Sequence, residues 1–380
     1  VMKKILIIHS TYSKKGGEDI AVENEIELLK TKYDVEVVYF ENKIQNIIDL
    51  FYLVTQNNLK SVNKVKEALL QFKPDIVYVH NTWFKASVGI FDLLKDYQGE
   101  VFIKLHNFRY LCSSNLLSKN HVLLKNDYCQ GCGHFFNKKI PIYKFYKEST
   151  IKSFFLYIYG RKYIKYLKAE KFKILVLTNF HKEIFKNYTN KNAYLMRNYI
   201  PGGDNNEITE KDEYILYAGR VSEEKGVNSL LATYEEIKNP KYKLLIIGDG
   251  PEFNKLEKEF SSENIKFTSQ LSNHETLKLI KKSRCVVTAT KLYEGQPTLL
   301  CEASLNQVPS IFPDTGGIKE FFPSNYKLTY EQFNYDQLKS IFYNINNEEI
   351  ENIGLDVKNF YIENFSKDQY FKTFESLITA

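Results

Sequence analysis

The sequence predicts an α/β protein with two domains, each built around a parallel sheet. Its 380 residues exceed the size of one ordinary domain. An apolar run at residues 5–8, a glycine loop and a helical pattern at 18–32 lead into a second apolar run at 35–40, which is the order strand, helix, parallel strand. The same order restarts at residues 214–217, so the second half repeats the architecture of the first.

A turn-rich segment separates the two halves. Residues 201–206 read Pro-Gly-Gly-Asp-Asn-Asn and form the clearest break in composition. We interpret them as a linker, with the first domain at residues 1–200 and the second at 201–355. Composition is otherwise ordinary for a globular protein, with 43% hydrophobic and 26% charged residues. No apolar run approaches the ~18 residues of a membrane span, and the N-terminal run is too short for a signal peptide.

The other elements follow from apolar periodicity. Further strands are expected at residues 75–80, 101–105, 174–177, 194–199, 243–247, 265–268, 285–287 and 310–312. Helices are expected at residues 43–72, 87–94, 141–170, 227–237, 273–281, 335–344, 348–364 and 367–379. Ligands of such sheets bind beyond the carboxyl ends of the strands, so the loops that leave the strands are the first candidates for a site.

The stretch from residue 288 to 302 carries the strongest chemical signal. Glu294 precedes a turn, Pro297 opens the helical run after it, and Glu302 lies within that run. Proline is favoured at a first helical turn, and the free amides that follow it attract anions. Amides that hold a phosphate beside carboxylates that hold hydroxyls indicate a nucleotide-sugar site. The alternative is a surface turn with two incidental glutamates.

Three further loops carry candidate residues. Arg220 and Lys225 lie on one strand-to-helix loop between two glycines and can both bind a diphosphate, Arg through its planar fork and Lys as a point charge. Gly16 and Gly17 at the first helix let a phosphate or substrate approach the backbone, although they form no Gly-x-Gly-x-x-Gly fingerprint. His106 follows a strand, where its side chain could take part in the site. The alternative is a purely structural role.

These motifs resemble those of the retaining glycosyltransferases with the GT-B fold, family 4 of the group 1 transferases. The matching patterns are Glu294-x7-Glu302, the Gly-Arg-x4-Lys-Gly loop and the Gly-Gly-x-Glu loop. The resemblance implies two Rossmann-like domains facing a cleft, with C-terminal helices at residues 356–380 that cross back to the first domain. It also implies that the second domain holds the donor and the first the acceptor, and that transfer retains anomeric configuration.

The resemblance also implies roles for single residues. Glu302 is expected to hold the ribose hydroxyls, Glu294 to face the sugar, and His106 to contact the transferred sugar or the acceptor. The expected catalytic residues are His106, Glu294, Arg220 and Lys225. The expected substrate-binding residues are Gly16, Gly17, Gly219, Gly248, Gly295, Pro297, Leu299, Leu300 and Glu302. Where the family has a glycine near the base, this chain has Ser269, so the base stays open.

We therefore expect a retaining transferase that moves a sugar from a nucleotide-sugar donor to a growing bacterial surface glycan, such as a capsule, wall or lipid-linked polysaccharide. No cofactor is expected to be required, because GT-B members generally need no Asp-x-Asp metal motif and none stands out. Two alternatives stay open: a catalytically silent GT-B partner or scaffold subunit, and a GT-B nucleotide-sugar epimerase or phosphorylase.

A cysteine-rich segment adds a separate hypothesis. Cys129 and Cys132 have the spacing of a metal knuckle, and together with Cys112 and His134 they offer the ligands of a structural zinc. A single Cys-x-x-Cys is only half of the strong pattern, so a loop with reduced cysteines is the alternative. The five cysteines show no disulfide framework, and we expect a cytoplasmic protein.

Residues 138–173 combine lysines with aromatic and aliphatic residues. Such a segment fits an anionic membrane surface, which would place the protein at the inner face of the plasma membrane. A solvated helix face over a core stripe is the alternative. Lysine with aromatic residues also suits nucleic acid, but no nucleic-acid motif is present, so no nucleic-acid partner is expected.

Overall fold

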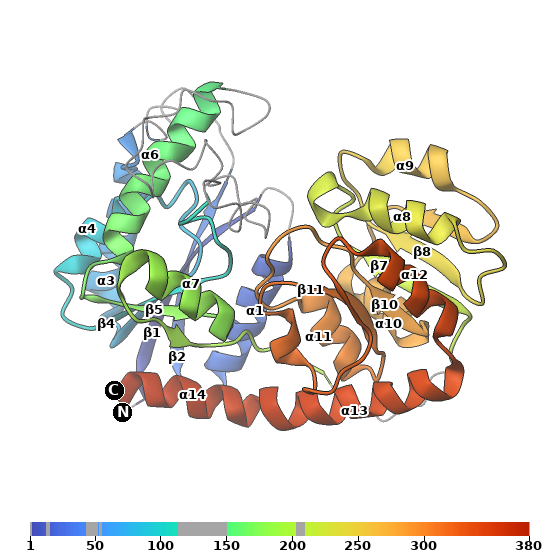
Figure 1. Ribbon diagram of the computed structural model, residues 1–380. Helices are drawn as coiled ribbons and strands as arrows, with labels where there is room; N and C mark the ends of the chain where they lie inside the picture. Colours follow the sequence, from blue (N-terminus) through green and yellow to red (C-terminus); the bar gives the residue numbers. More distant parts are fainter. Residues whose placement is uncertain are drawn as a thin grey trace. The chain divides into compact units, whose positions relative to one another are not determined.

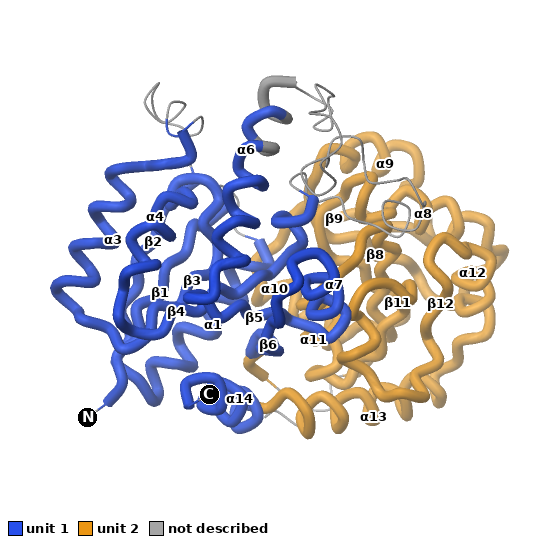
Figure 2. The backbone as a smooth tube through the Cα atoms, turned by 60° about the vertical axis from the view of Figure 1, so that its left-hand side comes forward, with its two compact units in different colours: residues 1–199, 367–380 blue, residues 200–366 orange. Residues whose placement is uncertain are grey.

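The computed structural model describes residues 2–12, 16–42, 52, 55–112, 150–202 and 210–379. The chain divides into two compact units (Figure 2): unit 1 is Val1–Tyr199 with Lys367–Ala380, and unit 2 is Ile200–Ser366. Each unit has one six-stranded parallel sheet with flanking helices (Figure 1), so the predicted fold class is confirmed.

The sheet of unit 1 has the order β2-β1-β3-β4-β5-β6. Its strands are β1 (Lys4–Thr11), β2 (Asp34–Glu41), β3 (Ile76–Val79), β4 (Glu100–Leu105), β5 (Phe172–Val176) and β6 (Tyr194–Leu195). Its helices are α1 (Gly17–Lys30), α3 (Leu59–Phe72), α4 (Ile90–Lys95), α6 (Thr150–Leu167), α7 (Asn179–Thr189) and α14 (Lys367–Thr379). The centre of β1 is fully buried, as expected for a strand that helices cover on both faces.

The C-terminal helix α14 is part of unit 1. Phe374 of α14 packs in one core with Ile26 of α1 and Ile7 of β1, so α1 and α14 cover the same face of the sheet. This confirms that the last helix returns to the first domain. The return lies at Ser366 rather than at the expected residue 356, because the preceding helix packs in unit 2.

Two predicted helices of unit 1 have bounds that differ from the expected ones. Within the predicted range 43–72, α3 begins at Leu59, after Gln56 with its positive φ of 55°. The sequence predicts a helix at residues 87–94, whereas α4 begins at Ile90. Ser87 has a positive φ of 60°, which no helix accommodates, and its hydroxyl accepts a hydrogen bond from the amide of Asn58 at 3.0 Å. The backbone at Ser87 therefore leaves the helical conformation, and its side chain bonds to the backbone of Asn58 where the predicted helix would have had its first turn.

The sheet of unit 2 has the order β12-β11-β10-β7-β8-β9. Its strands are β7 (Tyr214–Ala218), β8 (Lys243–Ile247), β9 (Ile265–Thr268), β10 (Cys285–Val287), β11 (Ser310–Asp314) and β12 (Thr329–Glu331). Its helices are α8 (Val227–Glu235), α9 (Phe253–Phe260), α10 (Asn273–Lys282), α11 (Thr298–Leu305), α12 (Tyr335–Asn344) and α13 (Asn347–Phe365). The sequence did not predict α9 or the edge strand β12.

Strand alternation divides the core of unit 2. Ile215 and Tyr217 of β7 point to the face that α8, α9 and α12 cover. Leu216, between them, points to the face that α10 and α11 cover, where Val357 of α13 also packs. The carboxyl ends of these strands, and the loops that leave them, carry the predicted site residues.

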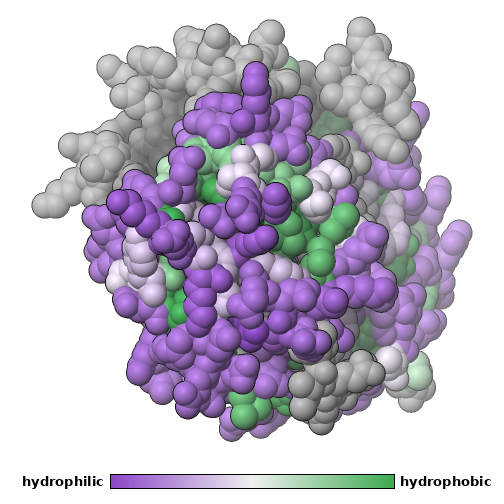
Figure 3. Space-filling view, turned by 90° about the vertical axis from the view of Figure 1, so that its right-hand side faces the viewer, coloured by the Kyte–Doolittle hydropathy of each residue, from purple (hydrophilic) through white to green (hydrophobic). Residues whose placement is uncertain are grey.

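The surface is largely polar on the face drawn in Figure 3 and along the outer side of α6. Figure 3 shows a face that is predominantly hydrophilic, with hydrophobic side chains gathered in a few places. On α6, Tyr159 and Tyr163 are buried whereas Arg161 and Lys165 are exposed, which is the pattern of a solvated face over a core stripe. Across the helices that the structure describes, none combines the length and hydropathy needed to cross a bilayer.

Candidate functional site

Two of the predicted residues meet in unit 2. Lys225 ends a short 3₁₀ turn after β7, and Glu294 lies in the loop after β10. Lys225 Nζ is 2.5 Å from Glu294 Oε1, and the hydroxyl of Thr290 donates to the same oxygen at 2.9 Å. The two charged side chains stay 34% and 24% exposed. An entering phosphate can therefore reach Lys225, in competition with Glu294.

Close backbone contacts hold the two loops together. Gly226 has a φ of 70°, and a Cβ at this position would lie 1.9 Å from the carbonyl oxygen of Ala289. The amide of Lys291 donates to the carbonyl of Glu224 at 3.0 Å. Only glycine fits at residue 226, and this fit brings Lys225 to the loop that carries Glu294.

The backbone of Glu294 is also fixed from its other side. The turn after β11 places Gly316 at a φ of 60°, where a Cβ would lie 2.3 Å from the carbonyl oxygen of Glu294. The amide of Gly317 donates to the same carbonyl at 2.9 Å. Gly316 and Gly317 together therefore position the backbone of Glu294.

Arg220 lies apart from this pair. Its side chain is exposed and, among the described residues, makes no hydrogen bond or ion pair. Its carbonyl accepts a hydrogen bond from the hydroxyl of Tyr217 at 2.8 Å. The structure thus fixes the backbone of Arg220 and leaves its guanidinium in solvent.

Gly219 and Gly248 leave the adjacent strands β7 and β8. A Cβ on Gly248, whose φ is 147°, would lie 1.9 Å from the carbonyl oxygen of Gly219. The amide of Gly219 donates to the carbonyl of Ile247 at 2.9 Å. The two predicted binding glycines therefore pack backbone against backbone, which larger residues would prevent.

The start of α11 differs in detail from the expectation. Pro297 is the residue before the helix and not its first residue, and its carbonyl accepts hydrogen bonds from the amides of Leu300 at 3.0 Å and Cys301 at 3.1 Å. The amide of Leu300 is therefore engaged within the chain, and its side chain is in the core. Gly295 and Leu299 are half-buried.

Glu302 is on the buried side of α11. Its side chain is 9% exposed, and burial raises the pKa of its carboxyl group to about 7. No hydrogen bond to this carboxyl group comes from the described residues, whereas its backbone carbonyl accepts from the side chain of Asn306 at 2.7 Å. A buried carboxyl group without a partner can bind hydroxyls.

Three histidines lie at the carboxyl ends of adjacent strands in unit 1. His9 is near the end of β1, His80 follows β3 and His106 follows β4. His80 Nδ1 and His106 Nε2 are 2.9 Å apart. Burial lowers the pKa of both histidines well below 6.5, so both are neutral at physiological pH. His106 is thus in place for hydrogen bonding and does not carry charge.

The glycine loop of unit 1 is tied to the first of these strands. The amide of Gly16 donates to Asp19 Oδ2 at 2.9 Å, and His9 Nε2 lies 2.9 Å from Asp19 Oδ1. A Cβ at Gly16 would meet nothing within 4 Å, and Gly17 is exposed as the first residue of α1. Packing against the described residues therefore does not require a glycine at residue 16.

Sequence reasoning missed a buried ion pair beside the histidines. Lys104 Nζ is 2.5 Å from Glu25 Oε1, and both side chains are fully buried. Desolvation raises the pKa of Glu25 and lowers that of Lys104. Ligand atoms of Glu25, His80 and His106 lie within 4.8 Å of one another, a spacing that could also suit a metal ion. Here Glu25 accepts a hydrogen bond from the Lys104 ammonium group, and the two histidines bond to each other, so a hydrogen-bonded network explains the cluster. The available signal was a lysine within an apolar strand.

The structure describes one of the four proposed zinc ligands. Cys112 is buried at the end of the segment that follows β4. Cys129, Cys132 and His134 lie outside the described residues. Structural zinc at these four residues therefore stays a prediction.

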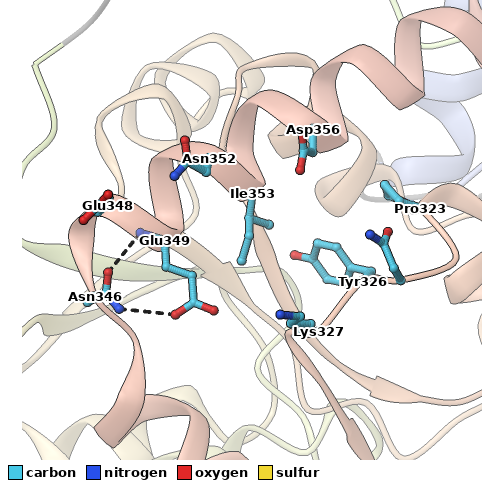
Figure 4. A pocket seen from close by; sticks show the side chains of 10 residues that line it. Pro323, Tyr326, Lys327, Asn346, Glu348, Glu349, Asn352, Ile353 and Asp356 are labelled. Atoms are coloured by element: carbon cyan, nitrogen blue, oxygen red, sulfur yellow. Dashed lines mark hydrogen bonds between the residues drawn. The ribbon is translucent and has the colours of Figure 1, made fainter.

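Figure 4 shows a cavity of about 470 Å³ in unit 2 that none of the predicted residues lines. Glu349 lies on its wall, where the side chain of Asn346 accepts a hydrogen bond from the Glu349 amide at 2.9 Å. This bond caps the start of α13, and acidic residues are favoured in a first helical turn. Helix capping thus explains acidic side chains at this cavity.

Comparisons with known proteins find similarity to glycosyltransferases, with a family match in the second unit. Residues 204–350 match the family described as glycosyl transferases group 1. The chain is 26% identical over 170 residues to the amylovoran biosynthesis glycosyltransferase AmsD of Erwinia amylovora, covering 42% of this chain and 48% of AmsD. It is 27% identical over 306 residues to an uncharacterized glycosyltransferase of Methanocaldococcus jannaschii, covering 75% of this chain and 66% of that protein. The matches thus span about half to two thirds of these curated relatives.

The solved structures extend the similarity to the whole chain at the level of the fold. The structure of Anabaena HepE in complex with UDP and glucose superimposes with a TM-score of 0.70 and covers 100% of both chains, at 12% sequence identity. Identity at this level supports the fold alone. Residues 204–350 of the second unit are therefore similar to the group 1 glycosyltransferases, and the chain has the GT-B fold.

Proposed function

We propose that the chain is a retaining glycosyltransferase that uses a nucleotide-sugar donor. The observation that carries this proposal is the pair Lys225–Glu294, which three backbone contacts hold at the carboxyl ends of β7 and β10. It lies within the residues that match the group 1 family. A partly exposed cation beside a partly exposed carboxylate offers one group for phosphate and one for sugar hydroxyls.

In this proposal unit 2 binds the donor. Lys225 neutralises the charge that builds up on the leaving nucleoside diphosphate, and Glu302 holds the ribose hydroxyls. The complex of HepE with UDP and glucose supports a nucleoside diphosphate as the leaving group. The bond between the sugar and the donor phosphate breaks, the acceptor oxygen takes its place on the same face, and the leaving phosphate accepts the acceptor's proton.

The acceptor is proposed to be a growing bacterial surface glycan, elongated in the cytoplasm. The name of AmsD assigns that relative to amylovoran biosynthesis, which favours a glycan acceptor. The exposed cations Arg161, Lys162 and Lys165 of α6 favour contact with an anionic membrane. Replacing these three residues by glutamine should abolish sedimentation with anionic vesicles, and unchanged sedimentation would remove the membrane from the proposal.

Donor binding and hydrolysis test the central claim. A panel of UDP-, GDP-, ADP- and dTDP-sugars is incubated with the native protein and with Lys225→Ala and Glu302→Ala. We expect one donor to release its nucleoside diphosphate slowly, and both variants to lose this activity. Lys339→Ala is the matched control, because Lys339 is a comparably exposed lysine of unit 2 that pairs with Glu236 at 2.6 Å.

Two outcomes decide between the transferase and its rivals. If no donor and no free nucleoside diphosphate binds, the silent scaffold becomes the better reading. If a donor is bound and its sugar is epimerised without transfer, the protein is an epimerase. With an acceptor in hand, NMR of the product's anomeric proton shows whether the donor's configuration is kept.

A further inference from the structure

Arg109 of unit 1 is held between aromatic rings beyond the carboxyl end of β4. Its guanidinium carbon lies 5.2 Å from the centroid of the Trp83 ring and 5.9 Å from that of Tyr12. The faces of such rings attract a cation and fix the plane of the guanidinium group. Arg109 is therefore positioned before any ligand arrives.

This guanidinium forms no close ion pair within the described residues, although the carboxylate of Glu18 lies near enough to interact with its charge. Within the described ranges, no carboxylate lies within ion-pair distance of Arg109, and its buried Nη1 atom has no hydrogen-bond partner. The neighbouring carboxylate of Glu18 accepts instead from the hydroxyl of Tyr12 at 3.0 Å and from the side chain of Asn107 at 3.2 Å. Since a buried N–H without a partner is costly, the Nη1 group of Arg109 has room for an oxygen acceptor that the described residues do not supply.

A small cavity lies beside this group. It measures about 20 Å³, and its lining includes Arg109, Lys104, His80 and His106 together with the carboxyl group of Glu18, whose pKa burial raises. This volume exceeds the ~10–15 Å³ that one water molecule or one oxygen atom needs. His80 Nε2 and His106 Nδ1 are also buried without a partner in the part of the chain that the structure describes. Because both histidines are neutral and share one hydrogen bond, one of these two outer nitrogens carries a hydrogen and can donate it to an oxygen atom, and the other can only accept.

We propose that unit 1 binds the acid group of an anionic acceptor sugar, a carboxylate or a phosphate, through Arg109, with one oxygen of that group in the cavity. Arg109 offers the planar fork that suits both acids. That the bound sugar is an acceptor rests on the proposed function. The binding of an acid group by Arg109 does not depend on it. The subsite would make the acidity of the acceptor a determinant of specificity.

The single tryptophan of the chain makes the test direct. Because Trp83 is in contact with Arg109, its fluorescence reports on an anion bound to the guanidinium. The full-length protein is titrated with glucuronic acid, glucose 1-phosphate and glucose at constant ionic strength. We expect saturable quenching by at least one acid and none by glucose. Comparing the two acids distinguishes a carboxylate from a phosphate acceptor.

Variants identify the residue responsible. Arg109→Gln should weaken binding of the acid at least about tenfold, because the charge and the fork are lost. Arg109→Lys keeps the charge without the fork and should weaken it severalfold, which guards against a loss caused by misfolding. The control is Lys66→Gln, an exposed lysine on α3 of the same unit, which should bind as the native protein does.

The results separate this inference from the proposed function. Binding of UDP is measured in parallel by calorimetry, and Arg109→Gln should leave it unchanged. Equal quenching by glucose and by the acids, no quenching by either acid, or undiminished binding in Arg109→Gln would overturn the subsite, whether or not UDP binds. Acid-dependent quenching in a protein that binds no nucleotide would support the subsite and remove the transferase.

Discussion

Lys225 Nζ and Glu294 Oε1 are 2.5 Å apart, although the two residues belong to loops that leave different strands of the unit 2 sheet. The cation proposed to bind the donor phosphate is thus neutralised in the free protein by the carboxylate proposed to face the sugar. Donor binding must exchange one partner of Lys225 for another. The free energy that Lys225 contributes to donor binding is therefore smaller than that of a lysine without a partner in the free protein.

Glu294→Gln should separate binding from chemistry. Without the competing charge, Lys225 should bind free UDP about fivefold more tightly, since a half-exposed ion pair is worth at most about 1 kcal/mol. Donor hydrolysis should fall roughly a hundredfold, as expected when a polar group facing the reacting sugar is lost. Calorimetry with UDP and a hydrolysis assay measure the two effects. Weaker UDP binding in the variant would contradict the exchange of partners.

Glu302 makes stability depend on pH. Burial raises the pKa of its carboxyl group from 4.5 to about 7, so between these values the folded protein holds a proton that the unfolded chain releases. The free energy of unfolding therefore falls as pH rises through this window, by at most about 3 kcal/mol. Glu302→Gln removes this loss, so its advantage over the native protein should grow from pH 5 to pH 8 in urea unfolding. A difference independent of pH would show that Glu302 ionises normally.

The sequence predicts the elements whose signals are local. Apolar runs locate the central strands, and the glycines at residues 219, 226 and 248 mark the loops where backbones meet. The resemblance adds the residues within those loops. What it leaves out is which side chains touch: Lys225 and Glu294 are both predicted, yet nothing in the sequence indicates that they pair with each other.

Features that depend on distant parts of the chain could not be predicted. Glu25 looks like one more charged residue of a surface helix, and only its contact with Lys104, far along the chain, makes it a buried network residue. Strand β12 has three residues and little periodicity to detect, although Tyr330 is in the core. Proline lacks the N–H that a central strand uses, so Pro313 argues against a strand in the sequence. In the structure it nevertheless lies in β11 and pairs with Tyr330 of β12.

Gly248→Ala should destabilise unit 2. Alanine at a φ of 147° is strained, and its Cβ would lie 1.9 Å from the carbonyl oxygen of Gly219, so the loops after β7 and β8 would have to separate. We expect a loss of about 2–4 kcal/mol, visible as a lower melting temperature. Gly16→Ala is the matched control, because a Cβ there meets nothing within 4 Å and no such loss is expected. Equal melting temperatures for both variants would contradict the packing at Gly248.

The ion pair of Glu25 and Lys104 should behave as a unit in a double-mutant cycle. Lys104→Met leaves the fully buried Glu25 without its cation, and the loss of one partner of a buried pair costs about 3–5 kcal/mol. Glu25→Met with Lys104→Met removes both charges and should restore most of that stability, since two apolar side chains need no partner. Urea unfolding of the four proteins measures the coupling.

The same cycle has a pH signature that separates charge from packing. In Lys104→Met, Glu25 escapes the cost of an unpaired charge by keeping its proton, and desolvation already raises its pKa in the native protein. The unfolded chain releases that proton as pH rises, so the variant should lose stability relative to the native protein from pH 5 to pH 8. The double variant carries no such proton and should show no additional loss. If Lys104→Met and the double variant responded alike to pH, the cost would lie in the shape of the side chains, and Glu25 would not be held by charge.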